Sequence, residues 1–201
     1  MNESIKITNY ITSYLNGYIQ NNKSTSEHTL KSYKLSLKLY LEYLEFIGIK
    51  INTITYDDFK MEKIQNWLIY LKDTKKNQNQ TINIRLTGLK IFLEYLGKQD
   101  ISLLYLYTEA CTIPKKKTTK IKVNGISKNA IQILFNSIEQ FSKTGKRDLT
   151  LFILMYNTGT RLNEILSLKI KDIRLDVFEP YINIVGKGNK LRALYIYYLK
   201  L

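Results

Sequence analysis

Apolar residues with helical spacing fill the first hundred positions of this sequence, and that pattern limits the fold more than any other feature. In each of four runs, apolar side chains recur every three or four residues, which predicts an amphipathic helix with one face in a core. The predicted helices cover residues 7–19, 26–48, 55–73 and 79–97, and a shorter one follows at 103–107. We therefore predict a helical domain over residues 1–111.

Short sequence signals mark where these helices begin and end. Ser26 is placed to cap the second helix, and Gly48 ends it. Thr55 and Asp58 have capping-box spacing at the start of the third helix. Gly97 is expected to stop the fourth helix. Because these signals coincide with the limits of the apolar runs, they support the same set of helices.

The pattern changes at residues 112–123, TIPKKKTTKIKV. This stretch contains Pro114 and five lysines without helical spacing, which predicts an extended basic linker between domains. Beyond it, Ser127 is placed to cap a helix, and RDLTLFILMYN is apolar nearly all round, as in a buried helix. YINIV and LRALYIY flank GKGNK and predict a β-hairpin. The chain is thus predicted to be mainly α, with an incomplete α+β domain at 124–201.

The chain carries a large excess of positive charge. Its net charge of +14 and its pI near 9.6 are unusual for a metabolic enzyme. They favour a polyanionic partner, either nucleic acid or an anionic membrane surface. An AT-rich coding sequence would itself favour lysine over arginine, so we take the few arginines as the more informative basic residues.

Cysteine usage and hydropathy argue against disulfides, cysteine-based metal sites, a signal peptide and membrane spans. Cys111 is the only cysteine, so neither an intramolecular disulfide nor a cysteine-based metal site is expected, which fits a reducing cytoplasm. The first residues lack an apolar core of signal-peptide length, and no run approaches a membrane span. We predict a cytoplasmic protein without a membrane partner.

The stretch NTGTRLNEILSLKIKDI, residues 157–173, contains the strongest candidate site. Gly159 interrupts a helical run, Arg161 follows it, and apolar residues then resume helical spacing. An arginine at the start of a helix, beside an N-terminus that favours anions, indicates a phosphate site. The simpler alternative is an exposed Arg161 that pairs with Glu164.

This stretch and the hairpin sequence VGKGNKLRALYI together resemble the start of the catalytic domain of tyrosine recombinases, the phage-integrase and Xer-type family. The upstream segments SEHTLKSYKLSLKLYLEYL and NQTINIRLTGLKIFLEYL resemble that family's helical, SAM-like core-binding domain. On this resemblance, the arginine of the family's T-G-x-R motif corresponds to Arg161 and the acidic residue three positions later to Glu164. The lysine of the G-K-G motif corresponds to Lys187.

The resemblance implies site-specific DNA recombination and integration, with no metal or cofactor. A tyrosine hydroxyl would attack a DNA phosphate to form a 3′-phosphotyrosine, and Arg161 would stabilise the charge of the phosphorane. Lys187 would protonate the leaving 5′-oxygen, while Glu164 would orient Arg161. Double-stranded DNA is the expected partner, and other recombinase protomers are further candidates.

Basic residues of the helical domain and the linker are candidates for contacts with DNA phosphates. They are Lys31, Lys34 and Lys38 on the second helix, Arg85 and Lys90 off the apolar face of the fourth, and Lys115, Lys116 and Lys117 in the linker. The alternative is that these side chains form ordinary solvated faces, which is the usual role of such charges.

Two parts of the family's active site have no counterpart in the sequence. His28 is the only histidine and lies in the helical domain, so an H-x-x-R box is absent from these residues. Tyr195, Tyr197 and Tyr198 follow the hairpin too closely to be the nucleophile, and Tyr195 and Tyr197 alternate as strand residues. We therefore expect a C-terminally truncated chain that binds DNA but does not catalyse recombination alone.

Two other functions stay open from the sequence. A non-enzymatic DNA-binding protein could occupy a recombination site and compete with an intact recombinase. A membrane-surface or scaffold protein would need Trp or Phe on the apolar side of a basic helix, whereas Trp67 lies in a helix of mixed charge. Comparing liposome binding with duplex binding would separate this last function from the others.

Overall fold

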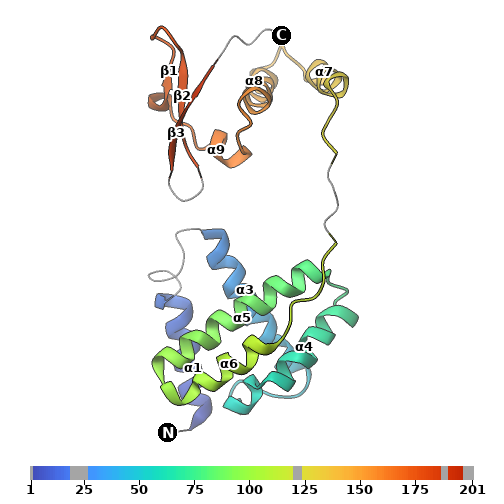
Figure 1. Ribbon diagram of the computed structural model, residues 1–201, viewed down its shortest axis with the longest axis vertical. Helices are drawn as coiled ribbons and strands as arrows, with labels where there is room; N and C mark the ends of the chain where they lie inside the picture. Colours follow the sequence, from blue (N-terminus) through green and yellow to red (C-terminus); the bar gives the residue numbers. More distant parts are fainter. Residues whose placement is uncertain (1, 19–26, 120–123, 187–189, 197–201) are drawn as a thin grey trace. The chain divides into compact units, whose positions relative to one another are not determined.

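The computed structural model describes residues 2–18, 27–119, 124–186 and 190–196 (Figure 1). The chain divides into two compact units, Met1–Ile121 and Lys122–Leu201. The boundary falls inside the predicted linker of residues 112–123. Within the described residues, no helix is both long enough and apolar enough to cross a membrane.

The first unit is a bundle of helices, as the apolar spacing predicts (Figure 1). Its α-helices are α1 (Glu3–Ser13), α3 (Glu27–Phe46), α4 (Met61–Asp73), α5 (Asn79–Gln99) and α6 (Leu104–Thr112). A π-helical turn, Tyr14–Tyr18, continues α1, and short 3₁₀ turns at Tyr56–Phe59 and Ile101–Leu103 precede α4 and α6.

The predicted helix limits hold in part. Gly48 has a φ of 89° just after α3, which confirms it as a terminator. Asp58 accepts from the Thr55 amide at 2.9 Å, but this box caps the 3₁₀ turn, and α4 begins only at Met61. The prediction for Gly97 is wrong, because α5 runs on to Gln99 and Gly97 is buried where a Cβ would meet Leu104 Cδ1 at 2.9 Å. Ser26, the predicted cap of α3, lies outside the described residues.

Aromatic side chains form the centre of the first unit. Trp67, Tyr40, Phe59, Phe92 and Tyr14 are all fully buried, and their consecutive ring centroids lie 5.0, 5.6, 5.8 and 5.1 Å apart. The series links α4, α3, the turn before α4, α5 and the turn after α1, so one core holds these elements together. The buried indole of Trp67 is not available as the anchor that a membrane-surface role requires.

The two longest helices, α3 and α5, approach closely at Gly88. A Cβ at this position would lie 2.4 Å from Ser36 Oγ, which is too close for any side chain. Ser36 is itself fully buried and donates to the Ser32 carbonyl at 2.8 Å. Gly88 therefore fixes the spacing of the two helices that present most of the unit's candidate basic residues.

The basic stretch after α6 is packed against the first unit. We call Ile113–Thr119 the docked segment. Asn83, on α5, donates from Nδ2 to the Lys116 carbonyl at 2.9 Å and accepts from the Lys116 amide at 2.8 Å. Asn79 donates to the Lys117 carbonyl at 2.7 Å. A side-chain amide that satisfies both polar groups of one residue fixes the register of that segment on the helix.

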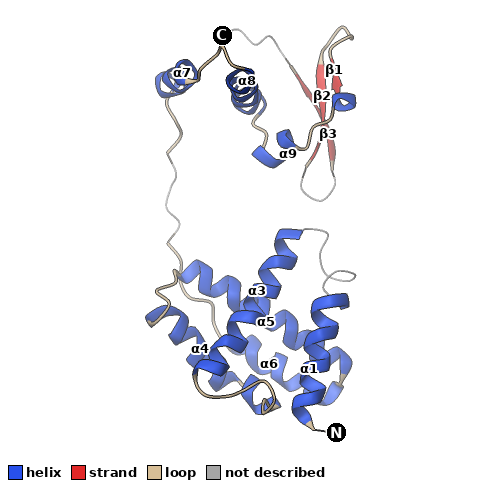
Figure 2. Cartoon of the chain, turned by 180° about the vertical axis from the view of Figure 1, so that it is seen from behind, coloured by secondary structure: helices blue, strands red, loops and turns tan. Residues whose placement is uncertain are grey.

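The second unit combines helices with a small antiparallel sheet, drawn in red in Figure 2. Its elements are α7 (Lys128–Ser137), α8 (Lys143–Thr158), α9 (Leu162–Leu166), a 3₁₀ turn (Ile170–Asp172), β1 (Ile173–Arg174), β2 (Tyr181–Val185) and β3 (Leu191–Tyr195). The strand order is β1-β2-β3. The predicted hairpin is β2 and β3, whereas β1 was not predicted.

Packing in the second unit is sparse. Its buried apolar residues, among those described, are Phe135, Ile153, Ile165, Ile182 and Ile184. The Ser127 cap of α7 is confirmed, since its hydroxyl accepts from the Ala130 amide at 3.2 Å. The prediction that α8 is buried nearly all round is wrong, because Phe152 and Tyr156 are 42% and 51% exposed. The described residues of this unit therefore leave part of the apolar surface of α8 exposed.

Candidate functional site

The interruption between α8 and α9 is a left-handed turn at a glycine. Gly159 has a φ of 62°, and its amide donates to the Met155 carbonyl at 2.9 Å, which closes α8. The neighbouring Thr160 is buried, and its hydroxyl lies 2.9 Å from that of Thr158. Arg161 then has extended backbone angles and immediately precedes α9. The T-G-x-R stretch thus turns the chain so that Arg161 starts a new helix.

One buried carboxylate organises the surroundings of Arg161. Glu164 Oε2 accepts from the Arg161 amide at 2.9 Å, and Oε1 accepts from Arg161 NH1 at 3.0 Å. Oε2 also accepts from NH2 of Arg192, on β3, at 2.8 Å. A single side chain on α9 therefore joins the turn after α8 to the second strand of the hairpin.

The three groups have unequal exposure. The Glu164 side chain is 8% exposed, while those of Arg161 and Arg192 are 71% and 44% exposed. The hydrogen bond from the Arg161 amide, and then the two guanidinium groups, hold the pKa of the Glu164 carboxyl below its ordinary value. Two permanent positive charges share one negative charge, so the cluster keeps a net positive charge with guanidinium donors on the surface. Such donors suit the oxygens of a phosphate.

The hairpin loop begins beside the same carboxylate. The Gly186 amide donates to the Lys190 carbonyl at 2.8 Å, and a Cβ on Gly186 would lie 3.5 Å from Glu164 Oε1. Lys187, the predicted general acid, lies outside the described residues. The described part of the loop therefore places only its first residue, Gly186, close to the Glu164 cluster.

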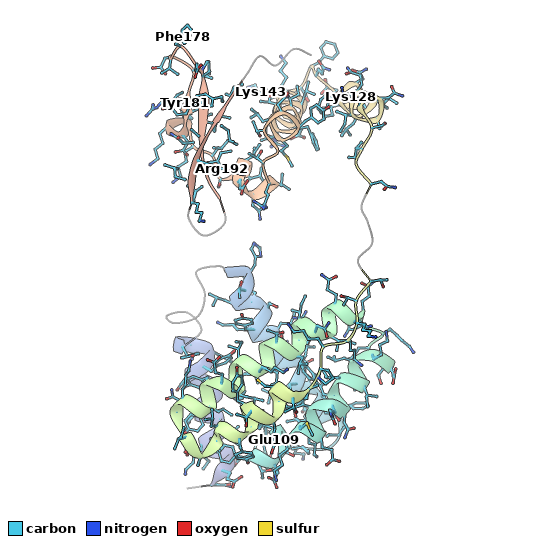
Figure 3. The ribbon with its side chains drawn as sticks, in the orientation of Figure 1. Glu109, Lys128, Lys143, Phe178, Tyr181 and Arg192 are labelled. Atoms are coloured by element: carbon cyan, nitrogen blue, oxygen red, sulfur yellow. The ribbon has the colours of Figure 1, made fainter. Side chains whose placement is uncertain are left out.

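Sequence reasoning missed Arg192, which Figure 3 labels on the hairpin near α9. The signal was present in the strand pairing, because Arg192 lies directly opposite Ile184 in the antiparallel register. Opposite residues share a face of the sheet, and Ile184 is buried. A hairpin centred on GKGNK would have placed Arg192 on the inner face, where a basic side chain needs a partner.

The predicted stripe of Lys31, Lys34 and Lys38 lies on the rim of a groove of about 1000 Å³ along α3. Its lining also includes the buried Leu37 and Leu44, which make part of it apolar. The charged residues of the lining are four lysines and two glutamates, so lysine is in excess. Lys38 pairs loosely with Glu42, at 3.7 Å between exposed side chains. The structure thus brings the three lysines together on one surface.

The other candidate basic residues lie along α5 and the docked segment. Lys90 Nζ donates to the Ile113 carbonyl at 3.2 Å, and burial lowers the pKa of Lys90. Lys90 therefore already has a structural role, which is to hold the start of the docked segment, in addition to any contact with DNA. Arg85 is half-buried, and burial lowers its pKa too.

A second groove, of about 850 Å³, runs where the docked segment meets α3 and α5. Polar side chains dominate its lining, which is Tyr33, Gln78, Gln80, Asn83, Ile84, Thr87, Lys115, Thr118 and Thr119. Lys115 and Lys117 are exposed, and Lys116 is half-buried with its backbone held by Asn83. The candidate residues of the linker therefore lie at or next to this groove of the first unit.

Positive charge is shared equally between the two units. Residues 1–121 contain 18 Lys and Arg against 11 Asp and Glu, and residues 122–201 contain 13 against 6, so each unit carries +7 of the total of +14. The described residues contain no group of three or more His, Cys, Asp or Glu side chains that could hold a metal ion. The candidate site is therefore one of positive charge and hydrogen-bond donors.

Comparisons with known proteins cover nearly the whole chain. Residues 11–100 match the family model "Phage integrase, N-terminal SAM-like domain", and residues 124–197 match "Phage integrase family". Tyrosine recombinase XerC of Staphylococcus epidermidis is 30% identical over 172 residues, which are 86% of this chain and 54% of that protein. XerC of Staphylococcus aureus strain NCTC 8325 is 28% identical over 170 residues, or 85% of this chain and 53% of that protein. The chain thus spans about half the length of the curated relatives it matches.

Among solved structures, the XerH site-specific recombinase bound to its palindromic difH substrate has a similar fold. The TM-score is 0.68 at 19% identity, over 97% of this chain and 65% of that one. The pre-cleavage XerH complex gives a TM-score of 0.65 at 20% identity, over the same shares of the two chains. At these identities the likeness establishes the fold.

Proposed function

The chain belongs to the phage integrase family of tyrosine recombinases, and from this we propose that it binds double-stranded DNA and directs Arg161 at a backbone phosphate. Site-specific recombination is the activity that the family implies for a complete active site. For residues 1–201 the proposal is narrower: they supply DNA binding and one part of the phosphate site.

The observation that carries this proposal is the Glu164 cluster. Its buried carboxylate accepts from the Arg161 amide at 2.9 Å and from the guanidinium NH1 at 3.0 Å, yet the Arg161 side chain stays 71% exposed. A guanidinium held in one orientation before the reaction stabilises developing negative charge without reorganisation at that moment. During attack on a phosphodiester, Arg161 would donate to the non-bridging oxygens of the phosphorane, and Glu164 would keep the fork in place.

The remaining catalytic roles follow from the family rather than from the described residues. Lys187 is proposed to protonate the 5′-oxygen as it leaves. Tyr195 is not proposed as the nucleophile, because it lies in β3 opposite Tyr181, with ring centroids 6.1 Å apart. Other recombinase protomers are proposed as partners, since recombination joins two duplexes.

The proposed DNA binding is tested by its dependence on salt. The slope of log affinity against log salt should be close to −0.9 for each phosphate neutralised, as for other phosphate-contacting proteins. Changing Lys31, Lys34 and Lys38 together to alanine should make this slope shallower by up to about 3 units. Fluorescence anisotropy with a labelled duplex, at several salt concentrations, measures it.

A matched control removes the same charge from another surface. Lys60, Lys63 and Lys98 each pair with an acidic neighbour, at 2.7, 3.7 and 2.8 Å. Their combined change to alanine should alter the slope less than the α3 variant does. Equal slopes in the parent and the α3 variant would show that the stripe is only a solvated face.

The alternative is a non-enzymatic role at recombination sites, for residues that include one histidine, His28, and no H-x-x-R box. Under it, residues 1–201 bind duplex DNA and form no covalent bond to a nicked suicide substrate. An adduct that survives denaturation and maps to Tyr195, Tyr197 or Tyr198 would exclude this role and assign the nucleophile. Absence of duplex binding would exclude both functions.

A further inference from the structure

We propose that Arg192 is a positioning residue for Arg161, acting through the carboxylate of Glu164. This inference rests on the proposed function, since it concerns how the phosphate-directed arginine is held. It gives a role to a side chain for which the T-G-x-R and G-K-G motifs have none.

The geometry shows why Glu164 alone is an incomplete support. Its two oxygens face donors from one residue, the amide and NH1 of Arg161. A carboxylate held only by that residue can rotate about its terminal torsion and exchange one donor for another. Arg192 NH2 adds a contact from a different element, at 2.8 Å to Oε2. That oxygen then receives donors from two directions, which fixes the plane of the carboxylate and with it the Arg161 fork.

Burial makes this third donor necessary. The Glu164 side chain is 8% exposed, so solvent offers little compensation for a lost hydrogen bond. Arg192 is itself held by the sheet, because it pairs with Ile184 inside the β2–β3 ladder, one pair away from its loop end. The carboxylate of Glu164 therefore couples the position of the hairpin to the orientation of the Arg161 side chain. Gly186, at the start of the loop that carries Lys187, lies against the same carboxylate.

The backbone amide of Arg161 offers a direct readout, because its hydrogen-bond acceptor is Glu164 Oε2. In R192M this amide should exchange with solvent about tenfold faster, as expected when a charge-assisted hydrogen bond to the acceptor is lost. R192K retains a donor and should restore most of the protection. Hydrogen exchange of the whole 201-residue chain, followed residue by residue by NMR, measures both.

Three comparisons separate positioning from a merely structural role. The Gly159 amide, bonded to Met155 within the end of α8, should be unchanged in R192M, whereas general loosening of the unit would affect both amides alike. R174M, at another strand arginine, should change neither amide. In an E164Q background, R192M should have a much smaller effect, because the neutral amide at position 164 lacks the charge that strengthens its hydrogen bonds to both arginines.

Duplex binding separates this inference from the proposed function. If Arg192 acts through Glu164, R192M in the E164Q background leaves the salt slope of DNA binding unaltered. A further loss of about 0.9 in slope would show that Arg192 contacts a phosphate directly and would overturn the proposal. Unchanged exchange of the Arg161 amide in R192M would overturn it as well. A parent chain that fails to bind duplex DNA removes the proposed function, while the exchange data still decide the Arg192–Glu164–Arg161 link.

Discussion

Glu164 is the residue on which the candidate site depends, and its protonation should be visible in the stability of the second unit. The pKa of its carboxyl lies below the ordinary value of 4.5, first because of the hydrogen bond from the Arg161 amide. Such a group stabilises the fold fully above the pKa of the unfolded chain, and this contribution disappears as the pH falls through the lower, folded-state pKa. The charged groups that face it in the described residues are the guanidinium groups of Arg161 and Arg192.

We therefore expect E164Q to be less stable than the parent above about pH 5, with the difference closing as the pH falls below about 4.5. Urea unfolding of the hairpin, followed by NMR at a series of pH values, measures the two curves. If the stabilities of the parent and E164Q change in parallel over this pH range, the negative charge of Glu164 does not stabilise the folded state.

Two buried tyrosines form a matched pair for a second prediction. The Tyr40 hydroxyl donates to the Asp58 carbonyl, whereas the Tyr14 hydroxyl has no hydrogen-bond partner among the described residues. Tyr40→Phe should reduce the stability of the first unit by about 1–2 kcal/mol, since a buried carbonyl loses its donor. Tyr14→Phe should leave stability unchanged or raise it by up to about 1 kcal/mol. Urea unfolding followed by the fluorescence of Trp67 compares the two variants, and the reverse order would contradict the assignment.

Individual residues show where sequence reasoning succeeds and where it fails. The sequence offered two interpretations of Arg161, a phosphate ligand or a partner of Glu164, and the structure has the pair while the guanidinium still faces solvent. The pair is found because both residues lie within one helical turn. Arg192 was missed because its contact joins positions 28 apart, which only the folded hairpin brings together.

Elements were predicted best where local spacing decides their limits. The helices of the first unit follow from apolar periodicity, and the β2–β3 hairpin follows from its glycine-rich loop. Two failures have one cause, which is tertiary packing. Gly97 continues α5 because α6 packs against it, and α8 is half exposed because few side chains of the second unit cover it. Neither fact is contained in the local sequence.

The docked segment also depends on tertiary contacts, and these yield a third prediction. Asn83→Ala removes both hydrogen bonds to the backbone of Lys116 and should open the segment locally. With a loss of about 1–3 kcal/mol, trypsin should cut at Lys115, Lys116 or Lys117 roughly ten- to a hundredfold faster. Gln80→Ala, an exposed change on the same helix, is the control. Equal cleavage rates in the parent and Asn83→Ala would show that the two hydrogen bonds from Asn83 do not hold the segment.

At the scale of the whole molecule, the two units differ in how much apolar surface they bury. In the second unit Phe178 is fully exposed and Phe141 and Ile170 are 95% and 92% exposed; Figure 3 labels Phe178 at the turn before β2. The first unit has instead a continuous core of buried aromatic and aliphatic side chains. Stability follows buried apolar area, so the two should unfold separately.

We expect amides in the core of α5 to be protected from hydrogen exchange at least a hundredfold more than those of β2 and β3. Exchange measured by mass spectrometry after peptic digestion gives both values. Limited proteolysis should accordingly cut first after Val185 or between the units. Equal protection of the two units would mean that another contact, such as one between copies of the chain, covers the exposed side chains.

The two hydrogen bonds between Asn83 and Lys116 affect where the first unit can be exchanged with that of a relative. A module that evolution or an engineer can transplant should include the contacts that hold it together. In the described residues, those of the first unit continue beyond Cys111, to the Lys117 carbonyl and to Thr118 and Thr119 in the second groove. A chimaera joined at Cys111 would set Asn83 against a foreign segment, whereas one joined after Thr119 transfers the helix and its segment together. Chimaeras joined after Thr119 should keep the duplex preference of the protein that supplies residues 1–119. The difference in duplex binding between the two kinds of chimaera then measures what the docked segment contributes.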